Sequence, residues 1–307
     1  MANEDPCRPI VVFGISGQLG IELGISLPAL GRIVGLTRAE ADLSRPESLR
    51  AIVRDIRPRI LINAAAYTSV DLAESETELV QTVNAIAPRV LAEEARSVGA
   101  CLIHYSSDYV FDGRREGAYV EGDAPNPLSV YGRSKLEGDK AVAGAGAAHV
   151  ILRTSWVYSA YRANFVKTIL RLAAERESLR VVGDQHGSPT SARLIARVTS
   201  QVVGAILRAS SSAPPSGLYH VTAHGATTWH GFARYVIAQA LDIGMPLRTT
   251  PEGVARITTA EYPTTAVRPF NSCLDTTRIR SELGLSLPDW REGVDSVIHQ
   301  LSALPAG

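Results

Sequence analysis

The amino-acid sequence predicts an α/β protein with a doubly wound parallel sheet and a smaller, mainly helical C-terminal part. Three observations support this fold class. The chain has 307 residues, of which 45% are hydrophobic and 20% charged, so it can bury a full core. Short apolar runs alternate with longer helical patterns through the first half, which is typical of βαβ units. After Arg153 the pattern changes to helices separated by proline-bearing loops.

In the first half, each strand that we expect is a short apolar run, and each helix repeats its apolar residues every three to four positions. The last of these strands ends near the position where the pattern changes. We expect strands at residues 10–13, 33–36, 60–62, 101–105 and 150–152, and helices at residues 18–30, 47–56, 78–98 and 131–142.

In the second half we expect helices at residues 164–175, 191–207 and 229–241 and short apolar runs at residues 180–182 and 218–221. A boundary near residue 155 would divide the chain into residues 1–155 and 156–307. The division is interleaved if the two apolar runs return to the first sheet. Residues 210–216, rich in serine and proline, form the weakest-ordered internal segment by composition but are too short for an interdomain linker.

Charge and cysteine content exclude several classes of protein. The 31 basic and 31 acidic residues balance, so the chain lacks the electrostatic signature of binding to nucleic acid or an anionic membrane. Cys7, Cys101 and Cys273 form no CxxC pair, so we expect neither a disulfide framework nor a cysteine metal site. Residues 1–9 do not resemble a secretory leader, and no run approaches 18 apolar residues. We therefore expect a soluble, cytoplasmic protein.

A glycine motif follows the first expected strand and opens the first helix. Residues 14–20 read GISGQLG, with Gly14, Gly17 and Gly20 in a GxxGxxG spacing. A dinucleotide diphosphate binds at this place because it needs close backbone approach and a helix N-terminus. The alternative is a tight turn that binds no ligand. The context of strand, turn and helix favours the dinucleotide site of a Rossmann fold.

The end of the second expected strand bears on the choice of cofactor. Where an acid would bind the adenosine ribose 2′-hydroxyl, the chain has Arg38. A guanidinium can pair with a 2′-phosphate, so we expect NADPH, with NADH possible; the alternative is an arginine that is only solvated. Asp42 and Leu43 follow at a distance suited to the adenine, although Asp42 could also cap a helix.

Three residues form a candidate catalytic set. Tyr131 and Lys135 are a YxxxK pair, and on a helix this spacing puts the phenol and the ammonium on one face. The cation would lower the pKa of the phenol towards the working range. Ser107, at the end of the fourth strand, can donate to a substrate carbonyl as negative charge develops there. The alternatives are an exposed Tyr–Lys pair and a serine that bonds only to local backbone.

Together these residues resemble an extended short-chain dehydrogenase/reductase, and more narrowly the family of dTDP-4-dehydrorhamnose reductases. The resemblance covers nearly the whole chain, and its most selective motifs lie in the second half. The motifs are residues 14–20, 63–68 (NAAAYT), 106–111 (SSDYVF), 131–135 (YGRSK), 153–158 (RTSWVY), 184–190 (DQHGSPT), 217–220 (GLYH) and 268–272 (RPFNS).

The resemblance implies a role for each matching residue. Tyr131 would be the proton donor and Lys135 its electrostatic partner, while Ser107 stands where the family often has threonine. Asp108 and Trp156 would contact the sugar, although Trp156 could be ordinary core, and Arg268 could bind the diphosphate or be a surface arginine. Residues that would line the cofactor are Gln18, Leu19, Asp42, Leu43, Ala66, Tyr67, Thr68 and Tyr105.

Some members of the family bridge a dimer through magnesium held by three glutamates. The matching positions here are Glu22, Arg193 and Arg291, and guanidiniums cannot supply the oxygen ligands that magnesium needs. We hypothesise that Glu22 pairs with these arginines in place of the metal, either within one chain or between two subunits. We expect the protein to be a monomer or a homodimer.

The resemblance implies reduction of the C4 ketone of dTDP-4-dehydro-β-L-rhamnose by NADPH. Two alternatives stay open. One is another nucleotide-sugar 4-ketoreductase or an epimerase, because the same tyrosine, lysine and serine set serves both. The other is a non-catalytic NADP-binding regulatory subunit.

Overall fold

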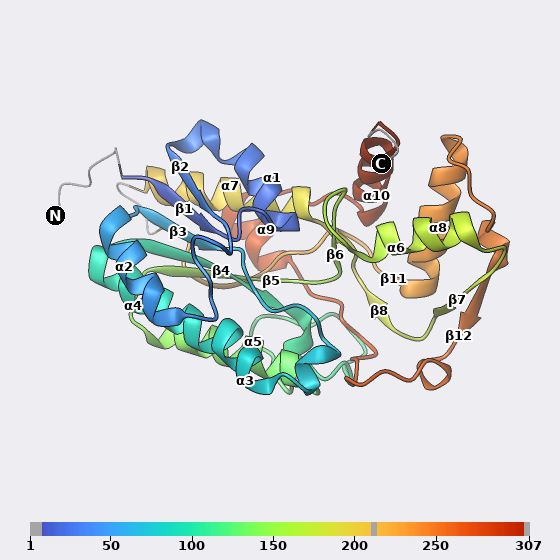
Figure 1. The fold of residues 1–307 in the computed structure, drawn as a ribbon, viewed down its shortest axis with the longest axis horizontal. Coiled ribbons are helices and arrows are strands. Elements are labelled where there is room, and N and C mark those ends of the chain that lie inside the picture. Colours follow the sequence, from blue (N-terminus) through green and yellow to red (C-terminus); the bar gives the residue numbers. More distant parts are fainter. Residues whose placement is uncertain (1–7, 210–213, 304–307) are drawn as a thin grey trace.

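A six-stranded parallel sheet forms the centre of the part of the protein that the computed structural model describes, residues 8–209 and 214–303 (Figure 1). Its order is β10-β5-β4-β3-β1-β2, and every neighbouring pair is parallel. This arrangement confirms the predicted doubly wound sheet. The strands are β1 (Ile10–Phe13), β2 (Ile33–Leu36), β3 (Ile60–Asn63), β4 (Cys101–Ser107), β5 (His149–Thr154) and β10 (Gly217–His220).

Helices cover both faces of this sheet because alternate strand residues point to opposite sides. Val12 packs in one buried cluster with Leu23 of α1 (Gln18–Ser26) and Ile195 of α7 (Ala192–Arg208). Val11 packs in the other cluster with Leu49 of α2. The helices on that second side are α2 (Pro46–Ile56), α4 (Ala87–Val98) and α5 (Val130–Gly144).

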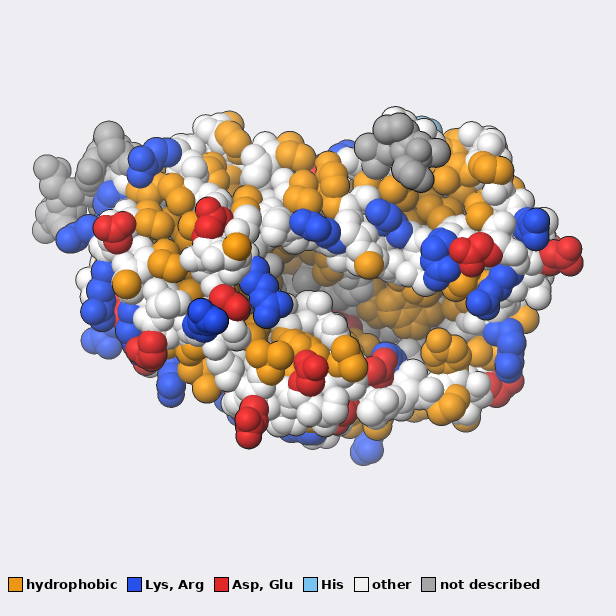
Figure 2. All heavy atoms as spheres, in the orientation of Figure 1, with side chains coloured by type: hydrophobic (Ala, Val, Ile, Leu, Met, Phe, Trp, Pro, Cys, Tyr) orange, Lys and Arg blue, Asp and Glu red, His pale blue; other side chains and the backbone are white. Residues whose placement is uncertain are grey.

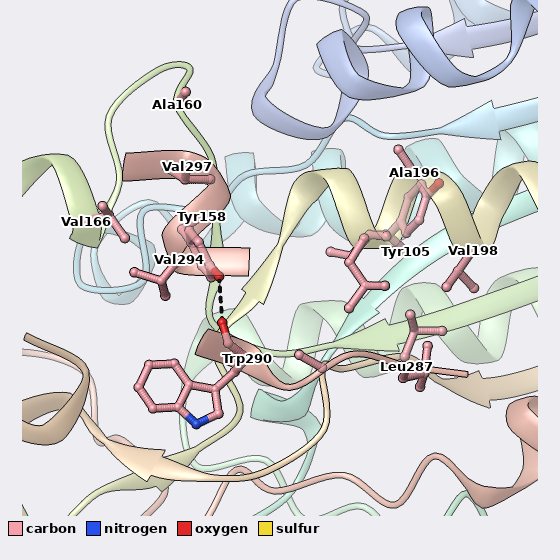
Figure 3. Packing of buried hydrophobic residues seen from close by; sticks show 14 of the residues in the cluster. Tyr105, Tyr158, Ala160, Val166, Ala196, Val198, Leu287, Trp290, Val294 and Val297 are labelled. Carbon is pink, nitrogen blue, oxygen red and sulfur yellow. Dashed lines mark hydrogen bonds between the residues drawn. The ribbon is translucent and has the colours of Figure 1, made fainter. Parts of the chain in front are cut away.

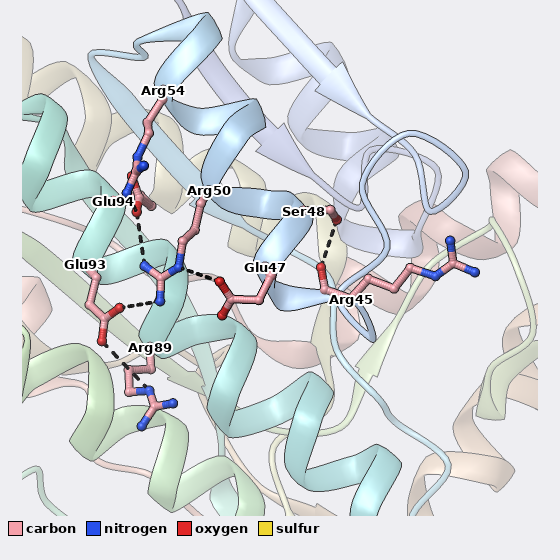
Figure 4. Close-up of polar contacts among 8 residues, drawn as sticks. All are labelled: Arg45, Glu47, Ser48, Arg50, Arg54, Arg89, Glu93 and Glu94. Atoms are coloured by element: carbon pink, nitrogen blue, oxygen red, sulfur yellow. Dashed lines mark hydrogen bonds and ion pairs between the residues drawn. The ribbon is translucent and has the colours of Figure 1, made fainter.

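Charged side chains join α2 to α4 on the outer surface (Figure 4). Glu94 is only 2% exposed and accepts hydrogen bonds from Arg54 at 2.6 and 2.7 Å and from Arg50 at 3.0 Å. Arg50 also pairs with Glu47 and Glu93. This network ties two helices that back the sheet on the same side.

The second half adds helices α6 (Phe165–Glu175), α8 (Trp229–Asp242), α9 (Thr277–Leu283) and α10 (Trp290–Ser302). The first buried cluster continues into α6, α8 and α10, where the Tyr158 hydroxyl donates to the Trp290 carbonyl at 3.3 Å (Figure 3). Short strands pair as β7 (Leu179–Val182) with β12 (Val254–Ile257), β6 (Val157–Tyr158) with β9 (Thr190–Ser191), and β8 (His186–Gly187) with β11 (Thr227–Thr228).

The structure differs from the sequence prediction in two of the expected helices, and it settles which sheet the runs near 180 and 218 join. The helix expected at 18–30 ends at Ser26, and a 3₁₀ turn follows because Pro28 has no N–H to continue it. The helix expected at 78–98 is divided into α3 (Thr77–Gln81), a π-helical turn (Thr82–Ile86) and α4. The run near 180 pairs with β12, whereas the run near 218 joins the central sheet as β10.

Some sequence expectations fall on parts of the chain that the structure does not describe. Residues 1–7, which include Cys7, lie outside the described residues, as do residues 210–213 of the serine- and proline-rich segment. Within the described ranges, no helix is both long and apolar enough to cross a lipid bilayer.

Candidate active site and cofactor cavity

A cavity opens where the strand order reverses. After β1 the chain goes to β2 on one side and then returns to β3 on the other, and doubly wound folds bind ligands at this point. The cavity has a volume of about 660 Å³. Figure 2 shows a hollow in the middle of the face that is turned to the viewer. Predicted site residues that line it are Gly14, Gly17, Gln18, Leu19, Arg38, Asp42, Leu43, Ala66, Tyr67, Thr68, Tyr105, Tyr131 and Lys135.

The glycine loop is shaped for close contact with a ligand. Gly14 has a φ of +79°, a conformation that side-chain-bearing residues rarely adopt. A Cβ on Gly20 would lie 2.1 Å from the Gly14 carbonyl oxygen, so the absence of a side chain at Gly20 lets α1 pack against the glycine loop. Gly20 itself does not line the cavity. α1 begins after Gly17, with no side-chain cap and no acid in its first turn. Its free N–H groups and helix dipole suit an anion.

Residues after β2 form the far end of the cavity. The Arg38 side chain is 80% exposed, and its Nε lies 3.6 Å from Asp42 Oδ2. A hydrogen bond from the Ser44 backbone is the main cause that holds the pKa of Asp42 below its usual range. Asp42 is thus an anion, and the Arg38 guanidinium stays accessible to a phosphate in solution.

The loop after β3 is held by Asn84, which the sequence reasoning did not identify. Asn84 Oδ1 accepts from the Tyr67 backbone N–H at 2.9 Å, and Nδ2 donates to the Tyr67 carbonyl at 3.1 Å and to Ser134 Oγ at 3.1 Å. It lies in the π-helical turn, a feature frequent at functional sites. Asn84 therefore connects the cavity wall to the helix that carries Tyr131.

Tyr131 and Lys135 share one face of α5, as predicted, and both line the cavity. α5 packs so closely against the π-helical turn here that a Cβ added to Gly138 would lie 2.2 Å from the Asn84 carbonyl oxygen. Only glycine fits at this position. Lys135 is 2% exposed, and its Nζ donates to the Tyr105 carbonyl at 2.6 Å. Tyr105 therefore contributes its backbone, while its hydroxyl lies 2.7 Å from Thr199 in the core.

The protonation of this pair differs from the sequence expectation. Burial raises the pKa of Tyr131 to about 12, against a lowering hydrogen bond with Ser107. Burial also lowers the pKa of Lys135 to about 8, although the buried carboxylate of Asp139 opposes that shift. The pKa of Tyr131 is therefore raised rather than lowered towards the working range as expected, because burial outweighs the other influences on this phenol.

Ser107 and Asp108 are not among the residues that line the cavity, although the preceding residue, Ser106, is. Ser107 Oγ donates to Asp108 Oδ1 at 2.9 Å and accepts from the Tyr109 backbone N–H at 3.2 Å. Ser155 Oγ donates to the other carboxylate oxygen at 3.0 Å. Asp108 is 3% exposed and burial raises its pKa. In this structure Asp108 holds Ser107 rather than presenting its carboxylate to the cavity.

Trp156 and Arg268 lie outside the cavity wall and are each engaged by another side chain. Trp156 has a φ of +47° and stacks on Trp229 with ring centroids 3.5 Å apart. Trp156 packs on core aromatics and is partly exposed, and its contact with the sugar stays a prediction. Arg268 donates to both oxygens of Asp71, at 3.0 and 2.7 Å. Arg268 is therefore not an unpaired surface arginine.

The residues at the three magnesium positions of the family form two separate clusters. Glu22 is 3% exposed, and its Oε2 lies 3.5 Å from Arg193 Nε, as hypothesised within one chain. Arg291 pairs instead with Asp289 at 3.1 Å and stacks over Trp290, so it does not join Glu22 within the chain. In the described residues no cluster of histidine, cysteine or acidic side chains could hold a metal ion.

Arg162 is a further cavity residue that the sequence reasoning missed. It lines the cavity together with Ser16 and Ala163, although it comes from the second half of the chain. None of the sequence motifs includes Arg162. It lies between the motif RTSWVY and the helix that starts at Phe165, and this position is the only hint that the sequence offers.

Comparisons with known proteins agree with this geometry. A family model described as "RmlD substrate binding domain" matches residues 8–303. The dTDP-4-dehydrorhamnose reductase of Burkholderia thailandensis is 44% identical over 295 residues, which cover 95% of this chain and 98% of that protein. The enzyme of the same name from Escherichia coli (strain K12) is 44% identical over 296 residues, 95% of this chain and 97% of that protein. A crystal structure of dTDP-4-dehydrorhamnose reductase from Bacillus anthracis in complex with NADP has a TM-score of 0.87 and 34% identity, covering 95% of this chain and 99% of that one.

Proposed function

Because the chain belongs to the family of the RmlD substrate binding domain, we propose that it reduces the C4 ketone of dTDP-4-dehydro-β-L-rhamnose and releases dTDP-β-L-rhamnose. One observation carries the proposal: Tyr131 and Lys135 line the same cavity as the glycine loop. A proton donor beside a dinucleotide site is what ketone reduction requires. The relatives named for this reaction support the choice of sugar.

The cavity suits NADP(H), which the related Bacillus anthracis structure contains. The glycine loop and the open N-terminus of α1 would hold its diphosphate, and Arg38 would hold its 2′-phosphate. Thr154 also lines the cavity, and its buried hydroxyl has no hydrogen-bond partner among the described residues. When bound, NADPH supplies the hydride for the reduction.

The protein's own residues manage the proton. Desolvation of the Tyr131 hydroxyl raises its pKa to about 12, so the phenol keeps its proton at neutral pH and can give it to the more basic sugar alkoxide. The Ser107 hydroxyl would polarise the same ketone oxygen once it turns its proton from Asp108 to the substrate. The ammonium of Lys135 would stabilise the phenolate after the proton leaves.

The sugar nucleotide would lie on the side of Tyr131 that faces the second half. Trp156 offers an apolar face for a deoxysugar, and Asp108 sets the position of Ser107. Arg268 would bind the diphosphate once it exchanges Asp71 for phosphate oxygens. We assign most contacts to the cofactor to residues 1–155 and most contacts to the sugar nucleotide to residues 156–307, with β10 and α7 returning to the sheet. We keep a cytoplasmic monomer or homodimer as part of this proposal.

A nicotinamide absorbance assay tests the proposal. The purified protein receives NADPH and dTDP-4-keto-6-deoxyglucose, with and without a 3,5-epimerase. Oxidation of NADPH only when the epimerase is present supports the proposed substrate. Oxidation without the epimerase would identify another 4-ketoreductase. No oxidation in either case, with NADPH still bound, would indicate a non-catalytic NADP-binding subunit.

A further inference from the structure

Arg162 lies against the glycine loop, although the chain reaches it only after β6. Its Nε donates to the Ser16 carbonyl at 2.7 Å, and the residue lines the cofactor cavity together with Gly17. The residue is exposed, so its guanidinium is open to solvent and to a ligand in the cavity. A cation from the second half of the chain thus borders the start of α1.

The backbone at Arg162 is held in an unfavourable conformation. Its φ of +57° lies in the left-handed region that favours glycine. The segment is fixed on both sides, because Ser159 Oγ and Asn164 Nδ2 each lie 3.0 Å from Gln18 Oε1 on α1. Strained backbone that neighbouring contacts hold in place is common at ligand sites. These contacts keep the Arg162 side chain beside the glycine loop.

Arg162 has unused hydrogen-bonding capacity at this position. An arginine has five N–H donors, and the Ser16 carbonyl takes one of them. Among the described residues, no carboxylate forms an ion pair with Arg162, whereas Arg38 lies 3.6 Å from Asp42. The first turn of α1 contains no charged side chain of either sign that would compete for an anion. Planar guanidinium groups bind phosphate oxygens in pairs, which suits the four remaining donors.

We propose that Arg162 is a cofactor-binding residue, which holds the diphosphate of the dinucleotide against the glycine loop from the side of the second half. The inference rests on the proposed function for the identity of the dinucleotide. Arg38, at the far end of the cavity, would serve the 2′-phosphate. The two arginines then divide the phosphate groups of one ligand between them.

Binding of adenine nucleotide fragments separates the two roles without an activity assay. ADP carries the diphosphate alone, and 2′-AMP carries the 2′-phosphate alone. By titration calorimetry, R162A should weaken ADP and NADPH binding by roughly tenfold and leave 2′-AMP unchanged, since a charge-assisted bidentate contact is lost. R38A should show the reverse with the two fragments. The slope of log Kd for ADP against log salt should fall by about 1 in R162A.

Two further variants distinguish direct contact from loop positioning. S159A removes a hydrogen bond to Gln18 without removing charge, so its salt slope should match the wild type. R162G also relieves the left-handed strain, so it should raise the melting temperature and still bind ADP weakly. Wild-type ADP affinity in R162A and R162G, or a salt slope lowered equally by S159A, would overturn the proposal for Arg162. Failure of the wild-type protein to bind NADPH would instead overturn the proposed function.

Discussion

Replacing Gly20 by alanine tests whether the close approach of α1 to the glycine loop is required. The new Cβ would lie 2.1 Å from the Gly14 carbonyl oxygen and 2.6 Å from Ile15 Cα, about 1.3 Å short of the ordinary contact distance for the carbonyl. Both neighbours are backbone, so the helix must move. Overpacking of this kind costs about 1–3 kcal/mol, against a gain of about 1 kcal/mol in helix propensity. We expect the free energy of unfolding to fall by up to about 2 kcal/mol.

Gly24 provides a matched control on the same helix. Its added Cβ would lie 3.4 Å from the Ile15 side chain, which is an ordinary contact. Gly24→Ala should therefore raise the free energy of unfolding by about 0.5–1 kcal/mol through helix propensity. Urea unfolding followed by circular dichroism measures both variants, and fluorescence titration measures NADPH affinity, which should fall at least about tenfold in Gly20→Ala. Equal stability and equal affinity of the two variants would refute the reasoning.

Three other predictions concern the catalytic helix and the surface network. Tyr131→Phe should lower kcat by about 10²–10⁴ with little change in NADPH affinity, and near-normal turnover would contradict the proton-donor role. Activity should decline as the pH rises through the pKa of Lys135, which burial lowers to about 8. Asp139→Asn removes the anion that raises the pKa of Lys135, so the alkaline limb of the kcat/KM profile should move to lower pH. If the variant folds and this limb does not move, Asp139 has only a structural role. Glu94→Gln should lower the free energy of unfolding by about 1–2 kcal/mol, because it removes the negative charge that pairs with Arg50 and Arg54. Urea unfolding measures this change, and a curve with the midpoint and slope of the wild type would show that the network adds no stability.

The sequence predicts the central sheet well because most of its strands are short apolar runs, and β1 and β3 are buried along their whole length. Residues 10–13 and 33–36 are the bounds of β1 and β2, since an uninterrupted apolar run between turn residues has few alternatives. α9 and α10 were not predicted. The run near 180 could not be assigned to a sheet from the sequence, because its partner β12 lies more than 70 residues further along the chain.

The candidate site could be predicted where a short motif fixes the local geometry. The glycine loop and the YxxxK pair each lie within one turn or one helix, and the family to which they pointed is confirmed. Asn84 and Arg162 belong to no such motif, because contacts between distant segments bring them to the site. The pKa of Tyr131 likewise depends on burial by the whole fold, which the spacing of tyrosine and lysine does not reveal.

The place of β10 at the border of the sheet has a consequence for dividing the chain. β10 pairs with β5, and Arg278 of α9 donates to the Leu218 carbonyl on β10 at 3.0 Å. A fragment that stopped at residue 155 would leave the longer β5 with unpaired backbone groups, a template for pairing with other chains. We therefore expect such a truncated protein to aggregate, so the two halves have to be produced as one polypeptide.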